Sequence, residues 1–123
     1  MMERQITKYS LAVLAIVFTS CYYDVAEVLY PPTNCVTDNM SYASDIAPIL
    51  QTNCYVCHSE TANNGNVTLE GHANVINYVN SGQLMGAIKH QPGFTAMPQN
   101  STPLSSCEIS KIEQWIVQGA QNN

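Results

Sequence analysis

Residues 54–58 hold the feature that most constrains this chain, because two thiols and an imidazole lie within five positions. They read Cys54-Tyr55-Val56-Cys57-His58. Two thiols three positions apart, at the end of a helical turn, can reach the two vinyl-derived carbons on one porphyrin edge. The imidazole that follows then projects toward the iron from the same side. This spacing is the attachment motif of a c-type haem, so we expect Cys54 and Cys57 to hold one haem c covalently and His58 to ligate its iron.

Three other interpretations of the motif remain open. A redox-active disulfide of the Cys-x-x-Cys kind needs a βαβ context, which the sequence lacks. A zinc site would need His72 or His90 to complete it, although the sequence has no second cysteine pair and no close histidine pair. Purely structural cysteines would leave a folded part of about 80 residues without the metal or cofactor that usually completes so small a core.

The first twenty residues have the pattern of a secretory leader. Two basic residues precede an unbroken apolar run at positions 11–18. As a helix this run spans about 12 Å, against a hydrocarbon core of about 30 Å, so it is too short to cross a membrane. Residues 18–21, Phe-Thr-Ser-Cys, resemble a bacterial lipobox with Phe18 where Leu is favoured. We therefore expect cleavage before Cys21 and lipid attachment to it, with ordinary signal cleavage and a spare thiol as the alternative.

The rest of the chain divides into a tether and a folded domain. Residues 21–40 contain Tyr30-Pro31-Pro32 and several turn formers, which disfavour a helix. We therefore predict a signal peptide at 1–20, a tether at 21–40 and a domain at 41–120. The protein is expected to be exported and held by its lipid at a bacterial membrane, facing the periplasm or the cell surface.

The distribution of charge excludes several partners. From Cys21 onward the chain has two basic residues, Lys89 and Lys111, against eight acidic ones. A surface with two lysines cannot form the basic patch that tracks a phosphate backbone, so a nucleic-acid partner is excluded. Steering toward an acidic protein is disfavoured for the same reason.

Helical periodicity and capping residues predict an all-α domain. Asp45 is expected to cap a helix that ends near Asn53. Two short helices are predicted at 73–79 and 83–89, separated by an Asn-Ser-Gly sequence. The clearest signal is the last one, where Ser105 and Glu108 form a capping box before an apolar stripe, and Gly119 ends the helix. No alternating pattern is long enough to predict a strand.

These motifs resemble, in their order, those of class I monohaem cytochromes c, and in particular the small lipoprotein cytochromes c of Bacteroidetes-type bacteria. The resemblance covers about residues 35–120. It rests on Tyr42-x-x-Asp45-Ile46-x-Pro48-Ile49-Leu50, on the haem motif, on Gly93-Phe94-x-x-Met97-Pro98, and on Ser105-x-Cys107-Glu108-Ile109 with Trp115-Ile116-x-x-Gly119.

The resemblance implies a small helical fold around one covalent haem, with the first and last helices packed together beside it. It also implies His58 and Met97 as axial ligands, and electron transfer to redox partner proteins of a respiratory or periplasmic chain rather than enzymatic activity. His90 is the rival sixth ligand. The alternative function is a small haem enzyme or ligand sensor whose sixth ligand dissociates. Family members often have a proline soon after the motif, whose carbonyl orients the haem histidine. Here no proline lies between His58 and Pro92, so the group that orients His58 is undecided.

The cysteine count predicts a disulfide. Five cysteines, less Cys21 for lipid and two for haem, leave Cys35 and Cys107 in an oxidising compartment. We expect these two to be bonded, with two buried free thiols as the alternative. Of the remaining histidines, His72 is expected at the surface.

Overall fold

The computed structural model describes residues 35–123, and this part of the chain contains helices and no strands. In chain order they are the π-helix η2 (Tyr42–Ile46), α3 (Ala47–Asn53), α4 (Tyr55–His58), the 3-10 helix η3 (Asn64–Asn66), α5 (His72–Asn80), α6 (Gln83–Ile88) and α7 (Ser106–Val117). The predicted all-α class is confirmed for these residues. The predicted leader, Cys21 and residues 21–34 of the predicted tether lie outside them. No helix within 35–123 is both long and apolar enough to cross a membrane.

The first helix begins at Ser41, four residues before the predicted cap at Asp45. Ser41 has an extended backbone, and its hydroxyl accepts a hydrogen bond from the Ser44 N–H at 3.3 Å. In return, the Asp45 carboxylate accepts a hydrogen bond from the Ser41 N–H at 3.0 Å. Asp45 therefore supports the cap from within the helix instead of forming it, because the serine four residues earlier supplies the oxygen that the first turn needs.

The last helix, α7, has the predicted capping box. The Ser105 hydroxyl accepts a hydrogen bond from the Glu108 N–H at 3.3 Å, and the Glu108 carboxylate accepts one from the Ser105 N–H at 3.0 Å. The helix ends at Val117, and Gly119 then adopts φ +100°, a left-handed conformation that glycine tolerates. Both predicted ends of this helix are therefore confirmed to within two residues.

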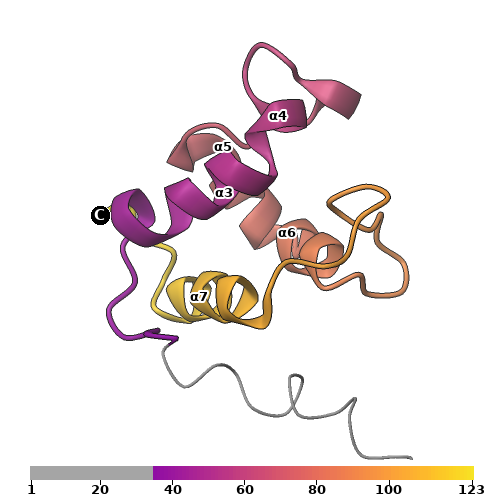
Figure 1. Ribbon diagram of the computed structural model, residues 1–123. Helices are drawn as coiled ribbons and strands as arrows, with labels where there is room; N and C mark the ends of the chain where they lie inside the picture. The colour runs from indigo at the N-terminus through magenta and orange to yellow at the C-terminus, as the bar shows by residue number, and fades with distance from the viewer. Residues whose placement is uncertain (1–34) are drawn as a thin grey trace, which may run out of the picture. The chain divides into compact units, whose positions relative to one another are not determined.

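The core is formed where the first and last helices meet. In Figure 1, η2 and α3 cross the domain beside α7, with α5 and α6 packed alongside, and η2 and α6 each contact α7. The side chains that are completely buried come from these helices and are Trp115, Ile46, Leu50, Ile112 and Val75. Because the first and last of the described helices both supply this core, residues between them belong to one folded unit.

His72 is part of this core edge and not the surface residue that we predicted. Its Nε2–H donates a hydrogen bond to the Ala120 carbonyl at 2.8 Å, and its ring meets Tyr42 and Trp115 edge to face, with centroids 5.0 and 5.9 Å away. The position at the start of a helix suggested exposure. The C-terminal segment folds back over α5 and covers it, which periodicity within α5 cannot indicate.

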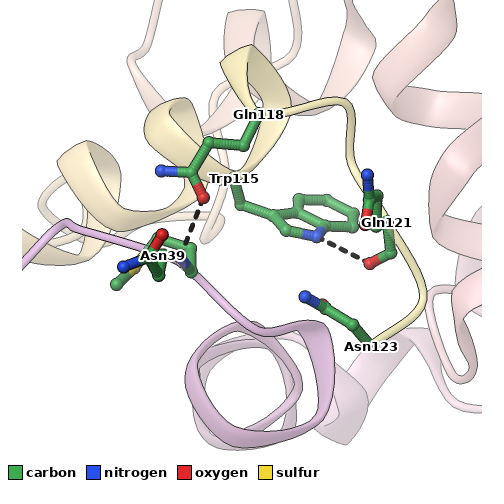
Figure 2. A pocket seen from close by; sticks show the side chains of 6 residues that line it. Asn39, Trp115, Gln118, Gln121 and Asn123 are labelled. Carbon is green, nitrogen blue, oxygen red and sulfur yellow. Dashed lines mark hydrogen bonds between the residues drawn. The ribbon is translucent and has the colours of Figure 1, made fainter.

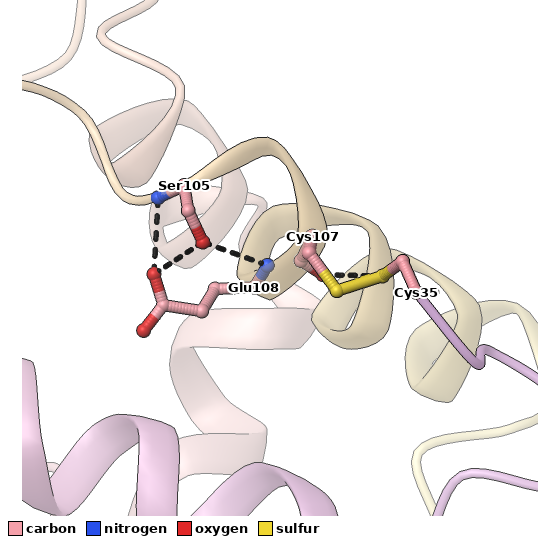
Figure 3. The surroundings of a disulfide bond; sticks show 4 residues. All are labelled: Cys35, Ser105, Cys107 and Glu108. Carbon is pink, nitrogen blue, oxygen red and sulfur yellow. Dashed lines mark hydrogen bonds between the residues drawn. A yellow bond between two sulfur atoms is a disulfide. The ribbon is translucent and has the colours of Figure 1, made fainter. Parts of the chain in front are cut away.

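A disulfide joins Cys35 to Cys107 in the first turn of α7, as the cysteine count predicts (Figure 3). The two Cα atoms are 5.6 Å apart, within the range of an unstrained bridge. Next to it, the Met40 side chain is 4% exposed, and the Met40 N–H donates to the Gln118 side chain at 2.8 Å. Residues 35–40, which we assigned to the tether, are therefore packed on the helical domain.

The C-terminal residues are tied to the start of η2. The Asn123 carbonyl accepts a hydrogen bond from the Ala43 N–H at 2.9 Å, and its side-chain oxygen accepts one from the Tyr42 N–H, also at 2.9 Å. The folded body thus includes residues 35–40 and 121–123, which lie beyond the predicted limits of 41 and 120. Helical periodicity and capping signals stop at the ends of helices. They therefore do not reveal the hydrogen bonds that irregular segments make beyond those ends.

Candidate functional site

The haem motif occupies the junction between α3 and α4. Cys54 ends α3, with its N–H donating to the Leu50 carbonyl at 2.8 Å, and its φ of −124° bends the chain before α4 begins. The N–H of His58 donates to the Cys54 carbonyl at 2.9 Å, so Cys54 and His58 are one helical turn apart. Cys54 and Cys57 are both free thiols, the first half-buried and the second exposed. The local geometry therefore presents two thiols and an imidazole from a single turn.

The environment of Cys54 keeps its thiol protonated. Burial, with a smaller contribution from the negative charge of Glu108, raises the Cys54 pKa from 9.0 to about 11. A redox-active cysteine needs surroundings that lower the thiol pKa. Cys54 has the opposite surroundings, which argues against the interpretation of the motif as a redox-active disulfide.

The start of α7 supports the motif through Glu108. The Asn53 side-chain amide donates to the Glu108 carboxylate at 3.0 Å, which joins the end of α3 to the capping box of α7. Burial acts to raise the Glu108 pKa, but hydrogen bonds from the Ser105 hydroxyl, the Ser105 N–H and Asn53 outweigh it and lower the pKa below its usual 4.5. Asn53, the residue before Cys54, is thus held in place by the Glu108 carboxylate.

The His58 ring is oriented by the Val67 carbonyl. His58 Nδ1 lies 3.2 Å from the Val67 oxygen, and because a carbonyl only accepts, Nδ1 carries the proton. The Leu69 N–H also donates to the His58 carbonyl at 2.7 Å, so residues 67–69 hold both the ring and the backbone of His58. This leaves the lone pair of Nε2 for a metal ion, as in ligating histidines whose other ring nitrogen donates to a carbonyl or carboxylate. The Val67 carbonyl is therefore the group that orients His58, which the sequence left undecided because no proline follows the motif closely.

The loop that holds Met97 is fastened to α6. The Met97 N–H donates to the Ala87 carbonyl at 3.1 Å, and His90 Nε2 lies 3.0 Å from the Met97 carbonyl. Met97 is half-buried, and its peptide bond to Pro98 is cis. Figure 1 shows this loop, in orange, and α4 on the side of the domain away from the C-terminus. His90, the rival sixth ligand, is half-buried, and its ring lies against the backbone of Met97.

A pocket of about 310 Å³ lies elsewhere, between the N-terminal segment and the end of α7 (Figure 2). Its lining is rich in side-chain amides and consists of Asn39, Met40, Trp115, Gln118, Gln121 and Asn123. The Trp115 indole N–H points across it and donates to the Gln121 carbonyl at 3.0 Å. None of the sequence-predicted site residues lines this pocket. A covalent haem would need a cleft with apolar walls between His58 and the loop of Met97, and this cleft is a prediction.

Within residues 35–123, no three histidine, cysteine, aspartate or glutamate side chains gather closely enough to hold a metal ion by themselves. Two free thiols and one oriented imidazole are the groups that attach a porphyrin and ligate its iron. The residues of the motif fit a covalent haem in their chemistry and in the tautomer of His58.

Comparison of the sequence with known protein families and with curated proteins, and of the structure with solved structures, found no match to this chain.

Proposed function

We propose that this protein is an electron carrier that holds one haem c, attached through Cys54 and Cys57 and ligated by His58 and Met97. The observation that carries the proposal is the hydrogen bond from His58 Nδ1 to the Val67 carbonyl. It selects the Nε2 lone pair of the one histidine that directly follows two free thiols. Metal-binding histidines usually have such a bond, which fixes the tautomer and the direction of the ring.

A bound haem would supply the one-electron chemistry, because its iron alternates between the ferrous and ferric states. The chain's own residues fix the surroundings of that chemistry. Val67 and Leu69 hold the His58 ring and backbone in place. Met97 extends from a loop whose backbone is bonded to α6, and its thioether would be the second protein ligand of the iron. A haem with both ligands supplied by the protein would favour electron transfer over the binding of peroxide or oxygen.

The location and the partners follow from the sequence and from the charge of the folded body. A lipid on Cys21 would hold the domain at a bacterial membrane, on the exported side where thioether bonds to haem are made. Residues 35–123 contain six acidic side chains and two lysines, and Lys89 is paired with Glu113 at 2.8 Å. The redox partners would therefore present neutral or basic surfaces to this domain.

The decisive experiment is the intact mass of the protein matured in a host that exports it and attaches haem. One added haem that survives acid extraction is expected, and it should be lost from Cys54→Ser/Cys57→Ser. The matched control, Cys35→Ser/Cys107→Ser, should keep the haem, because that pair forms the disulfide. Haem that washes out of the wild type on denaturation would overturn the proposal.

Carbon monoxide distinguishes the electron carrier from a haem enzyme or sensor. The reduced wild-type protein should bind carbon monoxide slowly or not at all, because Met97 fills the sixth position, while Met97→Ala should bind it readily. Rapid binding to the wild type would show a dissociable sixth ligand and would favour the enzyme or sensor.

A further inference from the structure

We infer that His90 is a positioning residue for Met97: its imidazole donates a hydrogen bond to the Met97 carbonyl and holds the methionine in the orientation that ligates iron. The inference rests on the proposed function, because it takes Met97 to be the sixth ligand. It replaces the rival role of His90, since the nitrogen that would bind iron, Nε2, is the one that carries the proton toward Met97.

Both polar backbone groups of Met97 are bonded to the end of α6. The Met97 N–H donates to the Ala87 carbonyl at 3.1 Å, and the Met97 carbonyl accepts from His90 Nε2 at 3.0 Å. Two bonds on opposite sides of one residue restrict its backbone rotation, and the direction of its Cα–Cβ bond is then fixed. A thioether side chain is flexible, so the precision of its placement has to come from the backbone.

His90 is itself held where it can make this bond. It follows α6 in the left-handed conformation, with φ +51°, which is uncommon outside glycine. Its N–H donates to the Ala87 carbonyl at 3.2 Å, the same oxygen that receives the Met97 N–H. The left-handed turn reverses the chain direction, so the imidazole faces the part of the loop that returns seven residues later.

The loop has a second attachment that does not depend on His90. The Gln91 N–H donates to the Gly86 carbonyl at 2.9 Å, and the Phe94 ring lies against the backbone of α6 at Gly86. A Cβ at Gly86 would overlap that ring, so only glycine lets it approach so closely. Removing the His90 imidazole should therefore leave the loop docked through Phe94 and release only the orientation of Met97.

The test compares His90→Ala and His90→Gln with the wild type, all as the haem-loaded protein. Methionine ligation gives a weak far-red absorption band in the oxidised state, and added imidazole competes for the same position. We expect His90→Ala to bind imidazole about five- to tenfold more tightly, the effect of one lost hydrogen bond on the closed site, and to weaken the far-red band. His90→Gln keeps an N–H donor and should restore much of the wild-type behaviour. Phe94→Leu loosens the loop without removing this bond. A change of the donor at position 90 should therefore not restore wild-type behaviour in that variant.

The outcomes separate the inference from the proposed function. If the wild type has the far-red band and His90→Ala changes neither the band nor the imidazole affinity, His90 does not position Met97. If His90→Ala opens the site while Met97→Ala does not, His90 is the ligand and the inference is overturned. If the wild type lacks the band altogether, it is the methionine ligation of the proposed function that fails. Should His90→Ala not fold, ¹⁵N spectra of the reduced wild type decide: the proton of His90 must reside on Nε2, and a proton on Nδ1 alone refutes the bond.

Discussion

Removing the disulfide between Cys35 and Cys107 should cost this small domain a large share of its stability. The change to make is Cys35→Ser with Cys107→Ser, because a single substitution would leave a thiol free to react with Cys54 or Cys57. The bridge joins residues 72 positions apart. The loop-closure relation gives about 4 kcal/mol for a separation of this length, gained by restricting the unfolded chain. Stabilities of small domains are about 5–15 kcal/mol, so the variant should be marginal.

The native state should change little, because residues 35–40 have other contacts. Met40 stays buried, and its N–H is bonded to Gln118 at 2.8 Å. The loss of stability should therefore come from the unfolded state, which gains conformational freedom when the crosslink is removed. Urea unfolding followed by circular dichroism should show a steeper m value, since an uncrosslinked chain exposes more surface when it unfolds. At an m of about 1–3 kcal/mol per M, the midpoint should fall by about 1.3–4 M.

Two controls make this result interpretable. Val36→Ala alters an exposed side chain next to the bridge, 64% accessible to solvent, and should change stability by less than about 0.5 kcal/mol. The wild type in reductant should approach the double variant. A loss below about 1 kcal/mol with an unchanged m value would refute the reasoning, because the bridge would then not be what restricts the unfolded chain.

Three further predictions concern single side chains. The buried hydroxyl of Tyr42 has no hydrogen-bond partner within residues 35–123. Tyr42→Phe should therefore keep the free energy of unfolding, measured by thermal unfolding, or raise it by up to about 2 kcal/mol, and a clear loss would reveal a hidden partner. In the haem-free protein at pH 8, iodoacetamide should label the exposed Cys57 well before the half-buried Cys54. The raised pKa of Cys54, about 11 in place of 9.0, leaves about 100-fold less Cys54 thiolate than an unshifted thiol would have, and equal labelling of the two cysteines would contradict this. Glu108→Gln should lower stability by about 1 kcal/mol at pH 7, as loss of a helix cap does. Its deficit should shrink as the pH falls below 4.5, because the native carboxylate, whose pKa is lowered, then protonates as well; a deficit that is constant with pH would exclude the linkage.

The features that the sequence could predict are those encoded by neighbouring residues. The capping box of Ser105 and Glu108 and the end of α7 near Gly119 depend on residues three or four positions apart, and the structure has both. The bond between Cys35 and Cys107 was predictable from a count, because other roles accounted for the remaining cysteines. The haem motif was evident for the same local reason.

The features that the sequence could not predict involve backbone atoms and distant segments. The Val67 carbonyl that orients His58 has no side-chain signature, since every residue carries a carbonyl. The bond from His90 to the Met97 carbonyl is hidden in the same way. The sequence predicts His72 at the surface because nothing near it in the sequence indicates a cover. Residues from the far end of the chain, such as Ala120, cover it only after folding. A shorter-range signal existed for the first helix, where Ser41 precedes Asp45 by four residues.

The position of the disulfide also has a mechanical consequence for a domain pulled from its N-terminal side. Tension that arrives along the chain at Cys35 divides between the backbone leading to η2 and the covalent branch to Cys107. Because the branch is a covalent bond into the first turn of α7, the load reaches that helix directly (Figure 3). Residues 36–106, including α3, α4 and the Met97 loop, then lie inside a closed covalent ring and cannot be drawn out to full length. If a lipid on Cys21 holds the protein at a membrane, as we propose, a pull along the chain would reach α7 through the disulfide, and the ring that contains His58 and Met97 could not be extended by it.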